Sequence, residues 1–255
     1  MMTLLWKGRE SMMEKPSADC TAYEIAENLK EIKDSMAEAC IKAGRRPEDV
    51  MLLGVTKTVP PQRINAAIAA GLRSIGENRV QELLGKKDEL TLAGVDVHLI
   101  GHLQTNKVSK IVGQVNMIES IDSFRLASAV NQASKKAGIV TDVLVQVNIG
   151  REQAKSGVME ENLEALLAEM GTLGSIKVRG LMTIPPIFDT EREKRAVFAR
   201  MYKLFIDIRG KKIDNVTIGT MPMDVLSMGM SGDYKEAILE GATIIRIGSA
   251  LFGKR

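Results

Sequence analysis

Cysteine and histidine are scarce in this sequence, which has two of each among 255 residues. The number and spacing of Cys20 and Cys40 fit neither a disulfide framework nor a thiolate metal site. Cys40 falls on the apolar side of a predicted helix, where a free cysteine behaves as a small buried hydrophobic residue. We therefore expect a protein of the reducing cytoplasm.

A large excess of charge and long apolar runs are also absent. The 35 basic and 32 acidic side chains leave a formal net charge of +3, too small an excess to predict a nucleic-acid or membrane partner. No apolar run approaches the ~18 residues of a membrane-spanning helix. Residues 1–18, whose apolar part is only Thr3–Trp6, are expected to be an N-terminal extension rather than a secretion signal.

Short apolar runs and helical patterns alternate along the rest of the chain. The expected strands are residues 50–55, 73–76, 97–101, 117–121, 142–149, 177–184, 216–219 and 243–247. Eight strands in alternation with helices predict a parallel sheet with helices outside it. Because 255 residues are close to the ~250 of a single (β/α)8 barrel, we expect one barrel domain of the TIM type over residues 19–255.

Helix signals support this order. Thr21 and Glu24 form a predicted capping box, and an apolar stripe from Ile25 to Cys40 follows it. A second capping box lies at Thr190–Glu193. The helical patterns between the strands run through Ile64–Leu72 and over residues 78–90, 106–112, 123–137, 160–170, 191–208 and 233–240.

The residues that directly follow each strand are the candidates for a functional site, since barrels of this type carry their sites at the carboxyl ends of the strands. Lys57 follows the first strand. We expect an amine beside a buried strand to be partly desolvated, which favours its neutral, nucleophilic form. The alternative is that Lys57 simply leaves the strand into solvent.

The end of the last strand has the features of an anion site. Gly248 allows close backbone approach, and Ser249 adds a hydroxyl, near the place where barrels often bind phosphate. Ser231 is a predicted N-cap of the following helix and a second anion ligand. A plain turn and a simple cap are the alternatives. Arg246 lies within an apolar strand, so it is either paired in a salt bridge or bonded to a cofactor ring nitrogen.

Other strand ends add weaker candidates. They are Glu77–Asn78, residues 101–107, Asn148, residues 182–186 and the Lys155–Gly157 loop. Of the two histidines, His98 is expected to be a satisfied strand residue, and His102 is better placed for a site.

Seven ordered motifs resemble the pyridoxal-phosphate homeostasis protein family, whose fold is that of the barrel domain of alanine racemase. They are LLGVTKT (52–58), IGENRVQE (75–82), HLIGHLQTNK (98–107), QVNIGREQAKSG (146–157), VRGLMTIPP (178–186), LSMGMSGD (226–233) and IIRIGSALFG (244–253).

The resemblance implies pyridoxal 5′-phosphate (PLP) as the cofactor. Lys57 would hold it as an internal Schiff base, Arg246 would face the pyridine nitrogen, and Ser231, Gly248 and Ser249 would bind the phosphate. Asn78 would lie beside the cofactor. The role implied is vitamin B6 and amino-acid homeostasis by a cytoplasmic monomer, rather than catalysis.

Two further features argue against catalysis. An arginine at the ring nitrogen keeps this nitrogen unprotonated, because two positive charges repel, and this weakens the ring as an electron sink. Tyr23, Tyr202 and Tyr234 all fall on predicted helices, and the chain ends soon after the eighth strand, so no tyrosine acid–base partner or additional β-domain is expected. The alternatives are a slow amino-acid racemase, a Schiff-base aldolase of phosphorylated sugars and a scaffold without a ligand.

Overall fold

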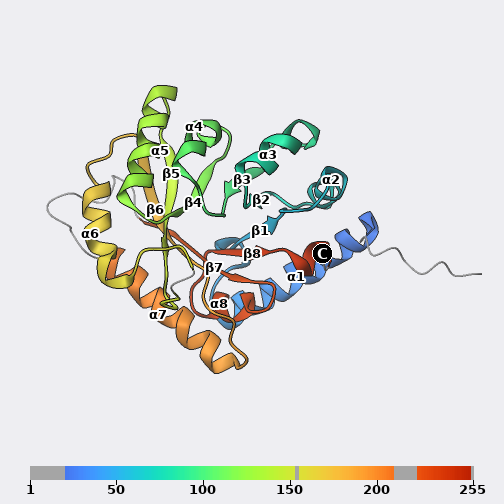
Figure 1. Cartoon of the computed structure of the whole chain (residues 1–255). Coiled ribbons are helices and arrows are strands. Elements are labelled where there is room, and N and C mark those ends of the chain that lie inside the picture. The colour runs from blue at the N-terminus through green and yellow to red at the C-terminus, as the bar shows by residue number, and fades with distance from the viewer. Residues whose placement is uncertain (1–20, 153–154, 210–222, 254–255) are drawn as a thin grey trace, which may run out of the picture.

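Eight strands form a closed barrel in chain order in the computed structural model, which describes residues 21–152, 155–209 and 223–253 (Figure 1). Each strand pairs in parallel with the next, and β8 pairs with β1. The strands are β1 (Met51–Val55), β2 (Ser74–Glu77), β3 (Asp96–Leu99), β4 (Met117–Ile121), β5 (Thr141–Val147), β6 (Ile176–Thr183), β7 (Val225–Met230) and β8 (Ile244–Ile247). The expected barrel is confirmed.

Helices surround the barrel on the outside (Figure 1). They are α1 (Ala22–Lys42), α2 (Pro61–Ala69), α3 (Val80–Lys86), α4 (Val108–Ile111), α5 (Phe124–Ala137), α6 (Glu160–Met170), α7 (Glu191–Arg209), α8 (Tyr234–Leu239) and α9 (Ser249–Phe252), with short 3-10 helices η1 (Pro47–Asp49), η2 (Lys87–Glu89) and η3 (Thr105–Lys107). No helix of the described ranges is long and apolar enough to cross a membrane. The monomeric state and the cytoplasmic location stay predictions.

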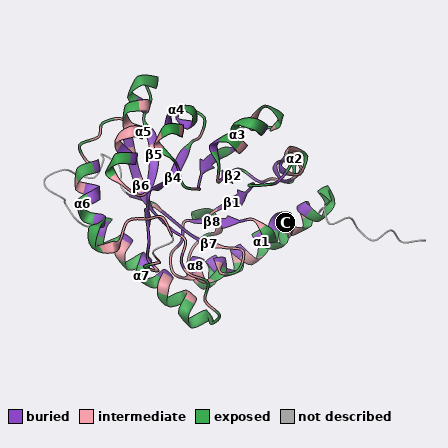
Figure 2. Ribbon diagram, in the orientation of Figure 1, coloured by how far each residue is buried: buried purple, intermediate pink, exposed green. Residues whose placement is uncertain are grey.

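The core has an inner and an outer part. The strands are buried on both faces, whereas the helices are exposed on their outer sides (Figure 2), as expected for parallel strands covered by helices. Strand residues such as Leu53 and Ile244 pack together with Ile100, and Met117, Leu144 and Met182 form a second such cluster. The large remaining cluster packs the strands against the helices and includes Cys40, the expected buried thiol.

The predicted position of the seventh strand is wrong. The strand between β6 and β8 is Val225–Met230, whereas the predicted residues 216–219 lie outside the described residues. Its sequence, VLSMGM, has the serine and glycine typical of a loop. Ser227 is nevertheless buried and hydrogen bonded, and at Gly229 a Cβ would lie 2.5 Å from that of Ala237 on α8.

Most helix predictions are confirmed. α1 begins with the capping box in which Thr21 and Glu24 exchange hydrogen bonds, and Thr190 and Glu193 form the same motif before α7. The pattern over 160–170 coincides with α6. The patterns over 78–90 and 106–112 divide into α3 with η2 and η3 with α4, because each segment begins or ends as a tighter 3-10 turn. Residues 1–20, which include the expected extension and Cys20, lie outside the described part.

Two glycines predict opposite effects of the same substitution. A Cβ at Gly101 would lie 2.7 Å from the Cα of Asn78, whereas one at Gly85, an exposed position of α3, would meet nothing within 4 Å. We expect Gly101→Ala to destabilise the protein by about 1–3 kcal/mol through overpacking. Gly85→Ala should stabilise it by roughly 0.5–1 kcal/mol through helix propensity. Urea unfolding of both variants measures this, and equal effects would contradict the close approach at Gly101.

Candidate functional site

A cavity of about 720 Å³ lies at the carboxyl ends of the strands. Its lining comes from β1, β7 and β8, from the segments that follow β1, β2, β3, β7 and β8, and from one residue of α7, with one apolar wall from the segment after β6. The lining residues are Val55, Lys57, Asn78, Ile100, Ile184, Pro186, Ile187, Phe188, Lys194, Met230, Ser231, Gly232, Asp233, Arg246, Gly248 and Ser249. The structure therefore brings all six predicted site residues together in one cavity.

Lys57 lies in a turn, two residues beyond the end of β1, and lines this cavity. Its side chain is exposed, so the expected desolvation by the strand is wrong. The reason is geometric, since the chain turns at Lys57 and Thr58, which are both exposed between the buried residues Thr56 and Val59. The amine is thus accessible at the cavity rather than enclosed by the barrel.

Arg246 on β8 is 3% exposed and lines the same cavity. Its guanidinium donates to the hydroxyl of Ser227 at 2.6 Å and to the carbonyl oxygen of Thr183 at 2.7 Å. None of the described carboxylates forms a direct ion pair with it, so the salt-bridge alternative does not hold. Burial lowers the pKa of Arg246, and the charges of Glu119 and Asp233 oppose this effect. The two protein hydrogen bonds leave further guanidinium N–H groups for a ligand.

A buried hydrogen-bond chain continues from Arg246 through the barrel interior. Ser227 donates to Glu119 Oε2 at 2.6 Å, and Glu119 Oε1 lies 2.6 Å from Nδ1 of His98. Burial acts to raise the pKa of Glu119, but the hydrogen bond and charge of His98 and the charge of Arg246 together hold it below its ordinary value. Glu119 is therefore an ionised carboxylate that balances Arg246 through Ser227. His98 is the satisfied strand residue that the sequence predicts.

Ser231, Gly248 and Ser249 form one end of the cavity. The Ser231 hydroxyl accepts hydrogen bonds from the backbone N–H groups of Gly248 and Ala250, each at 3.3 Å. The predicted N-cap role of Ser231 is wrong, because α8 begins after Asp233, and the hydroxyl instead reaches the start of α9.

This end has donors that an anion can use. The Ser231 oxygen accepts in both of these hydrogen bonds, and its own O–H has no acceptor among the described residues. The backbone N–H of Ser249 likewise has no partner within the described ranges. Lys194 of α7 also lines the cavity, and its ammonium donates to the carbonyl oxygen of Gly232 at 3.0 Å. These groups fit a phosphate.

Lys194 is a site residue that sequence reasoning missed. It lies in the first turn of α7, after the second capping box, and only the fold brings that turn to β7. Asp233 also lines the cavity; burial raises its pKa, and it accepts a hydrogen bond from the Met230 N–H at 2.6 Å. His102 and Asn148 do not line the cavity. Asn148 binds loop carbonyls of Glu152 and Lys155 instead.

The arrangement fits an aromatic ring that bears an aldehyde and a phosphate. The amine of Lys57 can condense with the aldehyde, the Ser231 end can hold the phosphate, and Arg246 can donate to a ring nitrogen. The apolar wall of Ile184, Pro186 and Phe188 can cover the ring.

Fold and site together define a parallel (β/α)8 barrel with a lysine-containing anion cavity, and comparison with known proteins gives the family. The chain matches the alanine racemase, N-terminal domain family over residues 24–255 and belongs to it. It is 42% identical to the pyridoxal phosphate homeostasis protein of Aquifex aeolicus (strain VF5) over 90% of this chain and 97% of that protein. The protein of the same name from Escherichia coli (strain K12) is 37% identical over 91% and 97%.

Solved structures agree with this assignment. PipY of Synechococcus elongatus PCC7942, solved with PLP bound, is 35% identical and superposes with a TM-score of 0.77 over 90% of this chain and all of that chain (100%). Alanine racemase of Clostridium difficile 630, at 16% identity and a TM-score of 0.66, covers 90% of this chain and 57% of that chain. The latter likeness concerns the fold alone. The predicted family resemblance is confirmed.

The ionised state of Glu119 predicts that the folding stability of the protein depends on pH. We expect Glu119→Gln to lower the free energy of unfolding by about 3–5 kcal/mol at pH 7, since it leaves buried partners uncompensated. A lowered pKa contributes stability that is present above the unfolded value and is lost as the pH falls through the folded value. The difference between wild type and variant should therefore shrink below about pH 4.3.

Urea unfolding between pH 7 and pH 3.5 measures this difference. Glu169→Gln, at an exposed position of α6, is the control and should change stability by less than about 0.5 kcal/mol at every pH. A difference for Glu119→Gln that grows on acidification would contradict an ionised carboxylate.

Proposed function

We propose that this protein binds PLP covalently through Lys57 and serves vitamin B6 and amino-acid homeostasis rather than turnover of a substrate. The observation that carries the proposal is that Lys57 shares one cavity with the donor-lined end at Ser231 and Ser249. PipY, a relative at 35% identity, is a PLP-bound protein. Relatives at 37–42% identity carry the name pyridoxal phosphate homeostasis protein.

The covalent link follows from elementary amine chemistry. The neutral Nζ of Lys57 adds to the aldehyde carbon, a C=N bond replaces the C=O bond, and one water leaves. Ser231 and Ser249 hold the phosphate with hydroxyl and N–H donors, and Lys194 adds a positive charge at this end. Since the exposed amine follows β1 and the phosphate end follows β7 and β8, at the same carboxyl ends of the closed barrel, both can act on one small molecule.

Arg246 favours binding over catalysis. PLP supplies an electron sink when its ring nitrogen is protonated. A guanidinium that faces this nitrogen opposes its protonation, because two positive charges repel. Glu119 balances the charge of Arg246 through Ser227, so Arg246 would hold a ring nitrogen that faced it in the unprotonated, less reactive state.

A slow racemase is the alternative function. The described tyrosines lie on α1, α7 and α8, and none lines the cavity. Among the described residues that line it, Lys194 and Asp233 are the titratable groups besides Lys57 and Arg246. Lys194 donates to Gly232 and Asp233 accepts from Met230, so a racemase built from the described lining would have to use one of these two bonded groups as the second acid–base partner of Lys57.

The anchor is tested by Lys57→Ala. We expect purified wild type to show a visible absorption band that borohydride removes, and peptide mass spectrometry to place the reduced pyridoxyl group on Lys57. Lys57→Ala should lose the band. Lys194→Ala, which removes the other cavity lysine, should keep the link while its PLP affinity falls about tenfold or more through loss of one charged contact. A reduced pyridoxyl group on Lys194, or none in wild type, would overturn the proposal.

The choice between binding and catalysis needs a separate measurement. The PLP-bound protein is incubated with L-alanine in deuterium oxide, and D-alanine and α-deuterium are measured by chiral chromatography and NMR. We expect neither to exceed the level that free PLP and the Lys57→Ala variant produce, because the ring is a weak electron sink. Sustained racemisation that requires Lys57 would establish the racemase instead.

A further inference from the structure

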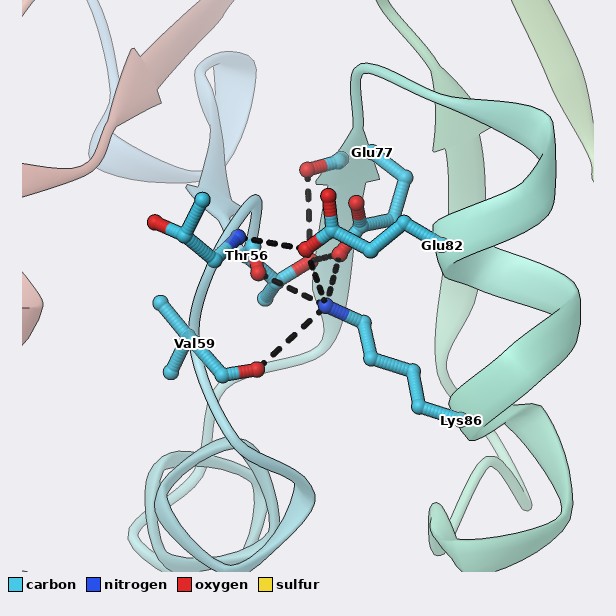
Figure 3. A network of polar contacts seen from close by, with 7 residues as sticks. Thr56, Val59, Glu77, Glu82 and Lys86 are labelled. Carbon is cyan, nitrogen blue, oxygen red and sulfur yellow. Dashed lines mark hydrogen bonds and ion pairs between the residues drawn. The ribbon is translucent and has the colours of Figure 1, made fainter.

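A buried charged cluster lies directly behind the turn that presents Lys57 (Figure 3). The side chain of Lys86 reaches from the end of α3 to this turn, and the carboxylates of Glu77 and Glu82 converge on its ammonium. Nζ of Lys86 lies 2.5 Å from Glu77 Oε1 and 3.1 Å from Glu82 Oε1. The side chains of Lys86 and Glu77 are only 9% and 0% exposed.

Lys86 also holds the backbone on both sides of Lys57. Its ammonium donates to the carbonyl oxygen of Thr56 at 2.8 Å and to that of Val59 at 3.3 Å. Glu82 accepts a hydrogen bond from the backbone N–H of Thr58. The residues before and after Lys57 are therefore tied to one ammonium and its two counter-ions.

The turn needs such support because its backbone is strained. Thr58 has a φ of 59°, in the left-handed region that a β-branched residue rarely adopts. Such a conformation costs of order 1–3 kcal/mol and persists only where the surroundings hold it. The hydrogen bond from the Thr58 N–H to Glu82 acts at this residue itself.

The cluster also joins the turn to the end of β2, whose next residue lines the cavity. The Thr56 hydroxyl donates to Glu77 Oε1 at 2.5 Å, and Glu77 directly precedes Asn78 of the cavity lining. Burial raises the pKa of Glu77, and the hydrogen bonds from Lys86 and Thr56 oppose this rise. Its other oxygen, Oε2, is buried without a hydrogen-bond partner among the described residues.

Stability does not explain why such a cluster is present. A buried ion pair is often no better than well-packed apolar side chains of the same volume, because desolvation offsets the attraction of the charges. Apolar side chains, however, have no directional bonds with which to fix the carbonyl oxygens of Thr56 and Val59 or the N–H of Thr58. The charged groups therefore fix the backbone conformation of the turn, which apolar side chains would not do.

We propose that Lys86, with its counter-ions Glu77 and Glu82, is a positioning residue that fixes the turn of Lys57 so that its amine is held ready for the aldehyde of PLP. This inference rests on the proposed function. It assigns Lys86 no contact with the cofactor, and Lys86 is not among the cavity-lining residues.

Lys86→Met tests the proposal, since it keeps an unbranched side chain of nearly the same length and removes its donors. The protein is freed of PLP with hydroxylamine and mixed with new PLP, and the growth of the visible band is followed. We expect capture at least about tenfold slower than in wild type, since loss of positioning of this kind costs up to about a hundredfold. Lys86→Arg, which restores a charged donor, should recover part of the rate.

Lys87→Met is the matched control. Lys87 is the next residue, and its ammonium donates to Gln114 at the surface; its variant should capture PLP at the wild-type rate. Circular dichroism and thermal unfolding report whether each variant is folded. A folded Lys86→Met variant that captures PLP at the wild-type rate would overturn the proposal. So would equal slowing by Lys87→Met.

Glu82→Gln decides the matter if Lys86→Met does not fold. The Glu82 side chain is 25% exposed, so its replacement is milder, and the amide oxygen can still accept from Thr58 while the charge that faces Lys86 is lost. We expect capture about threefold slower or more. In that case a wild-type rate for Glu82→Gln rejects the positioning role.

A readout without cofactor separates this inference from the proposed function. Backbone amide exchange at Thr58 and Val59 in PLP-free protein should be faster in the folded Lys86 or Glu82 variant than in wild type, because the turn has lost its anchor. If wild type captures no PLP, the proposed function fails, but amide exchange still tests whether Lys86 and Glu82 hold the turn. Unchanged exchange at both residues would reject the positioning role of Lys86, whether or not the variants bind PLP.

Discussion

The parallel pairing of β1 with β8 is the contact on which the site depends. It closes the barrel and sets Leu53 opposite Arg246 and Gly54 opposite Ile247. The residues that follow these two strands, Lys57 on one and Gly248 with Ser249 on the other, therefore reach the same cavity although they lie far apart in the sequence. An open sheet with β1 and β8 at opposite edges would separate the amine from the phosphate end.

Two buried cations, Arg246 in the cavity lining and Lys86 at the lysine turn, have different tasks. Arg246 is balanced at a distance by Glu119, with the Ser227 hydroxyl between them. Lys86 contacts its counter-ions directly and also holds backbone carbonyls. The first arrangement leaves guanidinium N–H groups for a ligand, whereas the second uses the ammonium entirely within the protein. The burial of these charges is thus tied to the cavity in one case and to the lysine turn in the other.

The sequence predicts the barrel and the six cavity residues because strand ends of a closed parallel barrel meet at one rim. It fails where the local pattern and the tertiary environment disagree. The seventh strand has the composition of a loop, and Ser227 and Gly229 are accommodated there only because Glu119 and α8 lie beside them.

Contacts between separate helices, strands and loops are the second reason why predictions from the sequence fail. Ser231 resembles a cap for α8 in sequence, but its hydroxyl meets the start of α9 instead. Lys194 and Glu119 give no local signal, since each acquires its partners from a distant segment. Lys86 has one local partner, Glu82 on the same helix, but its other partners come from β2 and the lysine turn. Lys57 is exposed because the chain turns where the strand ends, and the length of an apolar run does not reveal the direction of that turn.

In the proposed function, Arg246 and the lysine turn held by Lys86 together favour retention of the cofactor over its activation. The Arg246 guanidinium can only donate, so the Ser227 oxygen accepts from it and the Ser227 hydroxyl donates to Glu119. A guanidinium held in this way presents a donor, and not a proton acceptor, to a ring nitrogen. A ring bound there is oriented without gaining the positive charge that would stabilise a carbanion. In the proposed function, Lys57, held by its turn, would supply the covalent anchor, and the cavity that binds the ring would leave it a poor catalyst.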